Sequence, residues 1–231
     1  MHESCGVVGV YAPNEDVARL TFFSLFALQH RGQESSGIAT AGGKKLQVHA
    51  QMGLVSQVFD EEALSRLTGH IAIGHNRYST KGSSRICNAQ PIVVSNAANT
   101  VAIAHNGNIV NSEVLSRELS EQGYVFNTST DTEVIANSIL SAPGNDWIAK
   151  IRYTMRRIQG AYSLTLIIND RLFAARDPMG VRPLCLGSIN SGWVVASESC
   201  ALDHIGANFI REIEPGEIVS VSENGVESYR E

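Results

Sequence analysis

The sequence predicts an α+β fold in which two packed β-sheets each carry a helical layer on the outer face, a four-layer αββα arrangement. Two observations predict it. Helical patterns fall in two blocks that lie between β-rich blocks, and strands such as residues 161–168 are apolar almost without interruption, so both of their faces must be covered. The 231 residues contain no repeat, low-complexity tract or Pro/Ser-rich linker, which favours one domain.

The first part of the chain begins with a β-rich run, residues 5–12, that Pro13-Asn14 ends. Asp16 can cap a helix that extends through about Gln29 and is apolar on nearly all sides, which predicts a buried helix. Further expectations are strands at residues 37–41, 45–51 and 70–78, a short helix at residues 60–67 and a mobile polar loop at residues 79–91.

The run at residues 100–105 is expected to be a strand that breaks at the turn pair Asn106-Gly107. Helices should follow, the first capped by Asn111, the second by Asp131, and the third extending from Asp146 to about Gln159. The remainder is β-rich, with strands expected at residues 161–168, 171–175, 184–187, 193–197 and 217–221 and a last hairpin around residues 224–225.

Composition excludes several classes of function. Lys and Arg number 18 against 23 Asp and Glu, and the net charge of −5 argues against a nucleic-acid surface. No apolar run approaches the ~20 residues of a membrane span, and the first residues lack the features of a signal sequence. A cytoplasmic protein is therefore expected, without a membrane or nucleic-acid partner.

The four cysteines, Cys5, Cys87, Cys185 and Cys200, are widely spaced and include no Cys-x-x-Cys pair. Zinc sites usually show close pairs of ligands, so no metal site is expected within the chain. In a cytoplasmic setting the thiols should be reduced.

Cys5 is the most informative residue. If the residues before it are removed, it carries both a thiol and a free α-amine, and an amine with a pKa near ~8 can accept a proton from the thiol at neutral pH. The alternative is a small apolar side chain buried in an N-terminal strand.

Three further sites carry polar residues at the ends of expected elements. Arg77 could hold a carboxylate through two parallel hydrogen bonds, and Asn106 with the Gly107 backbone N–H could form an oxyanion hole. Asp131 could bind an ammonium group. Each also has an ordinary explanation: a surface ion pair, a hairpin turn and a helix cap, respectively.

Several motifs together resemble the glutaminase domain of the amidophosphoribosyltransferases, class II glutamine amidotransferases of the N-terminal nucleophile hydrolase superfamily. The resemblance covers residues 5–231. The main motifs are Cys5-Gly-Val-Val-Gly9, Leu28-Gln-His-Arg-Gly-Gln33, Gly74-His-Asn-Arg-Tyr-Ser-Thr80, Ala104-His-Asn-Gly-Asn108, Thr128-Ser-Thr-Asp-Thr-Glu133 and Arg176-Asp-Pro-Met-Gly-Val-Arg-Pro-Leu184.

The resemblance implies the αββα fold of that superfamily and a role for each matching residue. Cys5 would be the nucleophile, with its α-amine as proton acceptor, and Asn106 and Gly107 would form the oxyanion hole. Other matching positions would bind glutamine or shape its pocket: Arg77 for the α-carboxylate, Asp131 for the α-ammonium, Arg31 and Gly32 beside the nucleophile, and a closing loop at residues 78–84 that includes Tyr78 and Thr80.

The resemblance also implies what lies outside the matching residues. Removal of Met1 alone cannot expose Cys5, so residues 1–4 are expected to be a propeptide cleaved autocatalytically. Nothing in the chain matches the phosphoribosyl-pyrophosphate loop of the acceptor domain. That C-terminal phosphoribosyltransferase domain, with Mg²⁺ and, as often in propeptide-bearing relatives, a 4Fe–4S cluster, is expected to be absent here; the glutaminase reaction itself needs no cofactor.

The leading hypothesis is a glutaminase whose ammonia converts phosphoribosyl pyrophosphate to phosphoribosylamine in the first step of purine biosynthesis, in a full-length protein expected to be a homo-oligomer. Two alternatives stay open. One is a stand-alone amide hydrolase of the same superfamily, and the other is an unprocessed, non-catalytic regulatory module.

Overall fold

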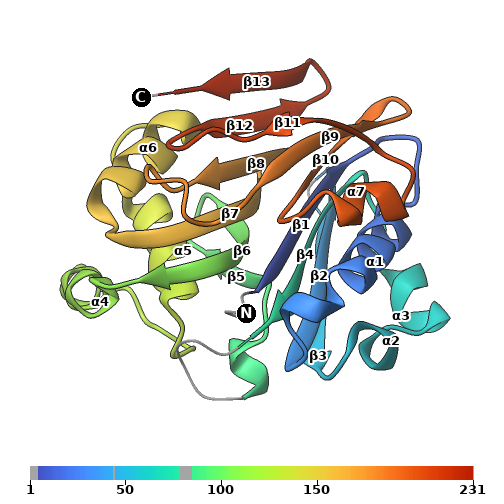
Figure 1. The fold of residues 1–231 in the computed structure, drawn as a ribbon. Helices are drawn as coiled ribbons and strands as arrows, with labels where there is room; N and C mark the ends of the chain where they lie inside the picture. The colour runs from blue at the N-terminus through green and yellow to red at the C-terminus, as the bar shows by residue number, and fades with distance from the viewer. Residues whose placement is uncertain (1–4, 44, 79–84, 231) are drawn as a thin grey trace.

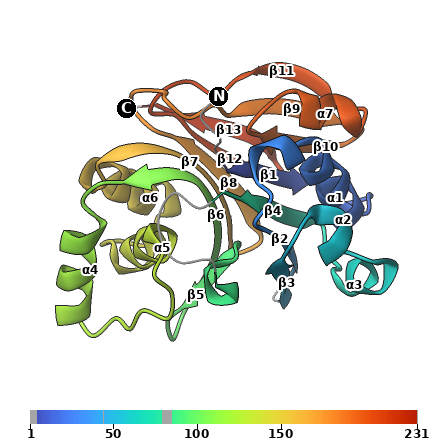
Figure 2. The same cartoon turned by 60° about the horizontal axis from the view of Figure 1, so that its bottom comes forward.

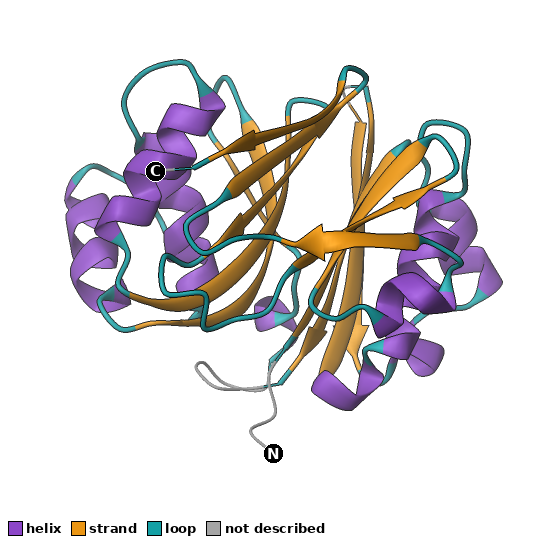
Figure 3. Cartoon of the chain, turned by 45° about the horizontal axis from the view of Figure 1, so that its top comes forward, coloured by secondary structure: helices purple, strands orange, loops and turns teal. Residues whose placement is uncertain are grey.

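The computed structural model describes residues 5–43, 45–78 and 85–230. Over these residues the strands form two sheets, and helices cover the outer face of each (Figure 1). Figure 3 shows the helices on the two flanks and the strands between them. The predicted α+β fold with four layers is confirmed.

The first sheet has seven strands within the described residues, in the order β11-β9-β10-β1-β4-β2-β3, and every neighbouring pair is antiparallel. Its strands are β1 (Gly6–Tyr11), β2 (Ser35–Gly42), β3 (Lys45–Met52), β4 (Ile71–Arg77), β9 (Cys185–Ile189), β10 (Gly192–Ala196) and β11 (Asn208–Glu212). Because β1 is the central strand, the residue that precedes it, Cys5, enters the middle of the sheet.

The second sheet has six strands in the described part of the chain, in the order β13-β12-β8-β7-β6-β5, again antiparallel throughout. Its strands are β5 (Ile92–Ser95), β6 (Thr100–Ile109), β7 (Gly160–Ile168), β8 (Arg171–Arg176), β12 (Ile218–Ser222) and β13 (Gly225–Tyr229). Strands β12 and β13, from the end of the chain, therefore extend the sheet that β5 to β8 form.

The helices divide between the two sheets (Figure 2). The first sheet is covered by α1 (Val17–Ala27), α2 (Val55–Val58), α3 (Glu61–Arg66) and α7 (Cys200–His204), and the second by α4 (Ser112–Glu121), α5 (Asp131–Ser141) and α6 (Trp147–Arg157). The described residues also include two short 3₁₀ segments, η1 (Gln29–Arg31) and η2 (Ile86–Asn88). None of the described helices has the length and apolar composition needed to cross a membrane.

In the described part of the chain three apolar clusters hold the four layers together, one beneath each helical layer and one between the sheets. Successive side chains of a strand point to opposite faces, and β1 shows the consequence. Val7 lies in the cluster between the sheets with Leu172, whereas Val8 and Val10 lie beneath α1 with Leu25. The central strands are buried on both faces, which explains their continuous apolar character.

Helix α1 begins as predicted, with the Asp16 carboxylate accepting a hydrogen bond from the Arg19 backbone N–H at 3.0 Å. It packs closely on β4 at Gly74, where an added Cβ would lie 2.6 Å from Thr21 Cγ2. The prediction that α1 is buried on nearly all sides was wrong: Phe23 and Phe26 are 46% and 47% exposed.

The strand expected to end at His105 does not turn at Asn106-Gly107. Strand β6 continues to Ile109 and pairs with β7 without interruption, from Val101 opposite Ile168 to Ile109 opposite Gly160. The long ladder with β7 outweighs the local preference of an Asn-Gly pair for a turn. Asn106 and Gly107 therefore lie inside a sheet.

Candidate active site

The Cys5 thiol lies where β1 begins and β4 ends. Gly6 pairs with Asn76, so Cys5 is beside Arg77 and Tyr78. Its Sγ atom accepts a hydrogen bond from the Tyr78 backbone N–H at 3.3 Å and lies at the same distance from the Tyr78 carbonyl oxygen. Cys5 is 7% exposed and is therefore a buried thiol at a strand end.

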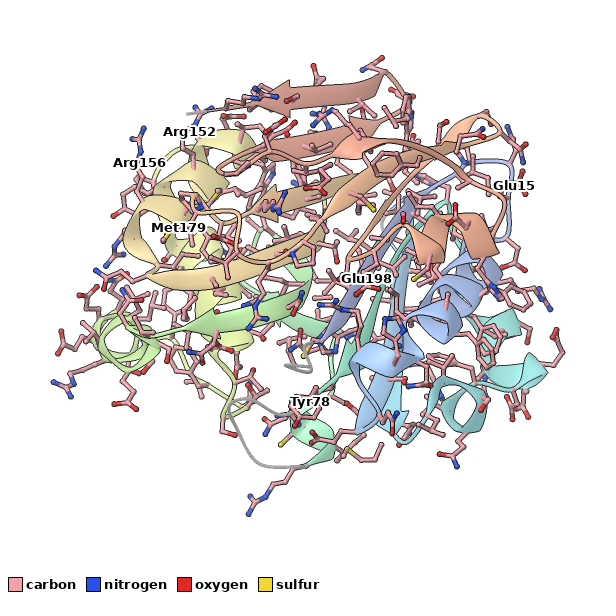
Figure 4. All side chains as sticks on the ribbon, in the orientation of Figure 1. Glu15, Tyr78, Arg152, Arg156, Met179 and Glu198 are labelled. Carbon is pink, nitrogen blue, oxygen red and sulfur yellow. The ribbon has the colours of Figure 1, made fainter. Side chains whose placement is uncertain are left out.

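Arg31, at the end of η1, holds the backbone of Cys5. Its Nε–H donates to the Cys5 carbonyl oxygen at 3.0 Å, while its guanidinium forms an ion pair with Glu198. Gly32 follows in extended conformation, and a Cβ there would lie 2.7 Å from the backbone of Arg77. Glycine is required because η1 lies directly against the end of β4. Figure 4 labels Glu198, the ion-pair partner of Arg31, and Tyr78, the neighbour of the Cys5 sulfur.

Arg77 is 2% exposed and pairs with Glu34, with 2.7 Å between Nη1 of Arg77 and Oε1 of Glu34. The guanidinium is therefore oriented before any substrate arrives. The sequence motifs do not identify Glu34, although it lies one residue beyond the Leu28–Gln33 motif.

Asp131 is the first residue of α5 and not its cap, because Thr130 occupies the N-cap position. The Asp131 carboxylate accepts a hydrogen bond from the Ile109 backbone N–H at 3.0 Å and lies 3.5 Å from Nδ1 of His105. Helix capping, the ordinary explanation for this residue, is thus excluded. The carboxylate is tied to the end of β6 instead.

Asn106 is fully buried in β6, and its side-chain amide has no hydrogen-bond partner among the described residues. A buried amide without a partner costs free energy unless something else, such as a ligand, satisfies it. Gly107 follows at φ +155°, and a Cβ there would lie 2.1 Å from the Ala161 carbonyl oxygen. The close approach of β7 requires glycine at this position.

His75 links the two sheets beneath these residues, a role that the sequence analysis missed. It lies on β4 opposite Val7 and is fully buried, and its Nε2 is 3.0 Å from the His105 carbonyl oxygen. Burial lowers the pKa of His75 to about 3, so the ring is neutral and Nε2–H donates. This bond fixes β6, and with it Asn106, against the strand that carries Arg77. The available signal was a histidine at the point where an apolar run, residues 71–74, passes into the polar residues Asn76 and Arg77.

The electrostatic surroundings of Cys5 include most of the residues singled out in the sequence. Burial raises the pKa of the thiol above its usual range. The hydrogen bond from the Tyr78 N–H lowers this pKa, and so do the positive charges of Arg77 and Arg31. The negative charge of Asp131 raises it further. The resting group is therefore a neutral thiol, which needs a base to become a nucleophile.

The motif at residues 176–184 builds a loop beside this region. Asp177 is fully buried and accepts hydrogen bonds from the backbone N–H groups of Met179, Val181 and Arg182. The loop joins β7 through Ser163, whose hydroxyl donates to the Pro183 carbonyl oxygen at 3.0 Å and which pairs with Asn106. Met179 projects from the loop (Figure 4). The buried Asp177 carboxylate thus holds a loop that supports β7, the strand next to Asn106.

The structure brings together Cys5, Arg31, Gly32, Arg77 and Tyr78, and places Asp131, Asn106 and Gly107 on the facing elements. Thr80, the rest of the expected closing loop and residues 1–4 lie outside the described residues.

The cysteines are free thiols, as expected. One group of three or more His, Cys, Asp and Glu side chains in the described part of the chain is close enough to share a metal ion: His30, Glu198 and Cys200.

Comparison with known proteins agrees with this geometry. A family model described as "Glutamine amidotransferase domain" matches residues 75–204, and the chain belongs to that family. Its relatives include the amidophosphoribosyltransferases of Synechococcus elongatus, 50% identical over 98% of this chain and 47% of that protein, and of Methanocaldococcus jannaschii, 45% identical over 98% and 49%. The resemblance seen in the sequence is confirmed, and the chain spans about half the length of these curated relatives.

Solved structures give the same result. The glutamine phosphoribosylpyrophosphate amidotransferase of B. subtilis, complexed with ADP and GMP, matches with a TM-score of 0.91 at 40% identity over 98% of this chain and 49% of that chain. A class-II glutamine aminotransferase domain protein from Silicibacter pomeroyi has a TM-score of 0.64 at 13% identity and is similar in fold alone. The predicted fold class, the N-terminal nucleophile hydrolase type, is thereby confirmed.

Proposed function

We propose that this chain hydrolyses glutamine to glutamate and ammonia with Cys5 as the nucleophile. One observation carries the proposal: a buried cysteine thiol lies at the end of a central strand, within electrostatic reach of two arginines and one aspartate. The thiolate attacks the side-chain amide carbon, ammonia leaves, and water then releases glutamate from the γ-glutamyl thioester.

The base in this scheme is the α-amine of Cys5, freed when residues 1–4 are removed. A free α-amine has a pKa near ~8, so a substantial fraction is unprotonated at neutral pH. It would take the proton from Sγ and pass it to the leaving nitrogen. The hydrogen bond from Arg31 to the Cys5 carbonyl oxygen supports this scheme because it holds the residue that carries both amine and thiol.

The oxyanion of the tetrahedral intermediate would be bound by the Asn106 side-chain amide and the Gly107 backbone N–H. The Asn106 amide supports this role, since it is buried and lacks a partner among the described residues. A donor held in place before the reaction stabilises developing charge without reorganisation.

The two charged groups of glutamine would be bound by opposite charges. Arg77, already oriented by Glu34, would hold the α-carboxylate in a bidentate manner, and Asp131 would hold the α-ammonium. Arg31 and Gly32 shape the wall beside the nucleophile. Residues 78–84, with Tyr78 and Thr80, would close over the bound amino acid.

We further propose that the ammonia serves an amidophosphoribosyl transfer to phosphoribosyl pyrophosphate, the first step of purine biosynthesis, within a longer, homo-oligomeric cytoplasmic protein. The names of the relatives and the half-length match support this part of the proposal. Any Mg²⁺ or 4Fe–4S cluster would then belong to the other half.

The test is glutamine hydrolysis by the chain processed at Cys5, compared with Cys5→Ala and Cys5→Ser. Both variants should lose the activity, because neither supplies a thiolate. If Cys5→Ala releases ammonia as fast as the parent, the mechanism is wrong. Two further results separate the alternatives. Preference for an amide without an α-amino group would favour a different hydrolase, and persistence of residues 1–4 in the mature chain would favour a non-catalytic module.

A further inference from the structure

A second cluster of reactive side chains lies on the other side of Arg31. His30 comes from η1, Glu198 from the segment after β10, and Cys200 from the start of α7. His30 Nε2 is 2.9 Å from Glu198 Oε2, the Cys200 sulfur is 3.7 Å from the same oxygen, and the three ligand atoms all lie within 4.8 Å of one another.

The orientation of each side chain suits a metal ligand. Nδ1 of His30 lies 3.1 Å from the Ala27 carbonyl oxygen, so Nδ1–H donates to it, and Nε2 faces Glu198 Oε2 at 2.9 Å. Nε2–H donates to the carboxylate in the metal-free protein, and a metal ion would take the place of that proton. A backbone carbonyl that accepts from the far nitrogen is the common way of orienting a histidine ligand. The second oxygen of Glu198 pairs with Arg31, which fixes the carboxylate in turn.

We propose that His30, Glu198 and Cys200 bind a divalent transition-metal ion, preferentially Zn²⁺. Nitrogen, oxygen and thiolate ligands at bond lengths of ~2.0–2.3 Å are those that zinc takes, and three protein ligands leave the fourth tetrahedral position to water. Ligand atoms around such an ion lie about 3.3–3.8 Å apart, a spacing that small side-chain rotations reach from the one observed.

The sequence alone does not reveal the site because its ligands come from two distant segments, and His30 and Glu198 are 168 positions apart. The site is also linked to the nucleophile. Glu198 is shared with Arg31, and Arg31 holds the carbonyl oxygen of Cys5. A cation on Oε2 draws charge from the carboxylate and weakens its hold on Arg31, so metal occupancy is coupled to the position of the nucleophile.

The test uses metal alone, in the full chain with Cys5→Ala so that the Cys5 thiol cannot bind the metal. Co²⁺, a spectroscopic substitute for zinc, is titrated into this protein, and Zn²⁺ binding is measured by equilibrium dialysis. One ion per chain is expected, with the charge-transfer absorption of a cobalt–thiolate bond. Adding Cys200→Ser should abolish the absorption, and adding His30→Asn should weaken binding at least about 10-fold.

Cys87→Ser is the matched control, because Cys87 is an exposed thiol outside the cluster and its loss should leave Co²⁺ binding unchanged. Zn²⁺ should also raise the Tm of Cys5→Ala and not that of the chain that also carries Cys200→Ser. The proposal is overturned if Cys200→Ser, folded by circular dichroism, binds Co²⁺ and Zn²⁺ as tightly as its parent. It is equally overturned if no ion binds in stoichiometric amount.

Discussion

At the scale of single residues, the proposed site depends on groups that are held in place before substrate arrives. Arg77 is paired with Glu34, Arg31 with Glu198, and Asp131 with the Ile109 backbone. Burial raises the pKa of the Glu198 carboxyl, but its ion pairs with Arg31 and His30 outweigh burial and lower it, so Glu198 stays charged at neutral pH. Asn106 differs from these residues because its amide is buried without a partner in the described chain.

Asn106→Ala should therefore lower kcat for glutamine hydrolysis by about 10²–10³-fold, because it removes a donor to the oxyanion. KM should change little, since the charged ends of glutamine are bound elsewhere. Steady-state kinetics on the processed chain measure both constants. Asn137→Ala is the matched control: Asn137 is also buried, its amide nitrogen also lacks a described partner, and it lies in α5. Similar losses of kcat in the two variants would exclude a direct role for Asn106.

At the scale of elements, the join between the sheets depends on a buried histidine. His75 stays neutral in the folded protein down to about pH 3, whereas in the unfolded chain it takes up a proton below about pH 6.5. Because the unfolded state then binds more protons, the stability that neutral His75 contributes is complete above pH 6.5 and is lost as the pH falls towards 3.

Between pH 7 and pH 5 this residue alone should reduce the free energy of unfolding by about 2 kcal/mol. His75→Gln keeps a donor for the His105 carbonyl oxygen and does not titrate, so its stability should fall by about 2 kcal/mol less over that interval. Urea unfolding at the two pH values measures the difference. His204→Gln, at an exposed position on α7, serves as the control and should follow the parent. Parallel curves for the parent and His75→Gln would contradict the assignment.

The elements also show which parts of the structure the sequence can predict. Long apolar runs placed β1, β4, β7 and α1, because burial on both faces or beneath a helix leaves a local pattern. The local pattern failed where contacts with distant residues determine the structure. Pairing with β7 continues β6 through Asn106-Gly107. Strand β11, which was not predicted, is an edge strand with exposed Phe209 and Ile210.

The residues of the candidate site divide in the same way, into those that a local motif identifies and those that depend on distant contacts. Cys5, Arg77 and Asp131 stand in recognisable motifs, and the sequence identified them. Glu34, Glu198 and His75 act by contacting other site residues across 43, 167 and 30 positions of the chain, respectively, and only the folded arrangement reveals such contacts.

At the scale of the whole molecule, the site lies where the ends of several elements from both sheets meet. Cys5 precedes the central strand of the first sheet, Arg77 ends its neighbour, and Asn106 lies on the second sheet. The apolar cluster between the sheets, with Val7, Ala104 and Leu172, fixes the distance between these layers. The proposed chemistry thus rests on the packing of the whole sandwich, and its proposed start is the removal of residues 1–4 at the beginning of the chain.

The last prediction concerns that beginning. If the α-amine of Cys5 is the base, glutamine hydrolysis should be proportional to the fraction of chains that start at Cys5, because an amide nitrogen bonded to Ser4 cannot accept a proton. A fusion cut by a site-specific protease immediately before Cys5 gives the free amine on demand. Intact-mass spectrometry measures the fraction of chains that start at Cys5, and ammonia release measures activity before and after cutting.

The processed chain should gain kcat/KM as the pH rises to about 8, where the amine loses its proton. The uncut fusion, which has the same thiol, arginines and oxyanion donors, is the matched control and should stay inactive at every pH. Cys5→Ala in the same fusion shows whether cutting alone releases ammonia. Activity of the uncut fusion equal to that of the cut chain would show that the thiol draws its base from elsewhere, and the α-amine would lose its assigned role.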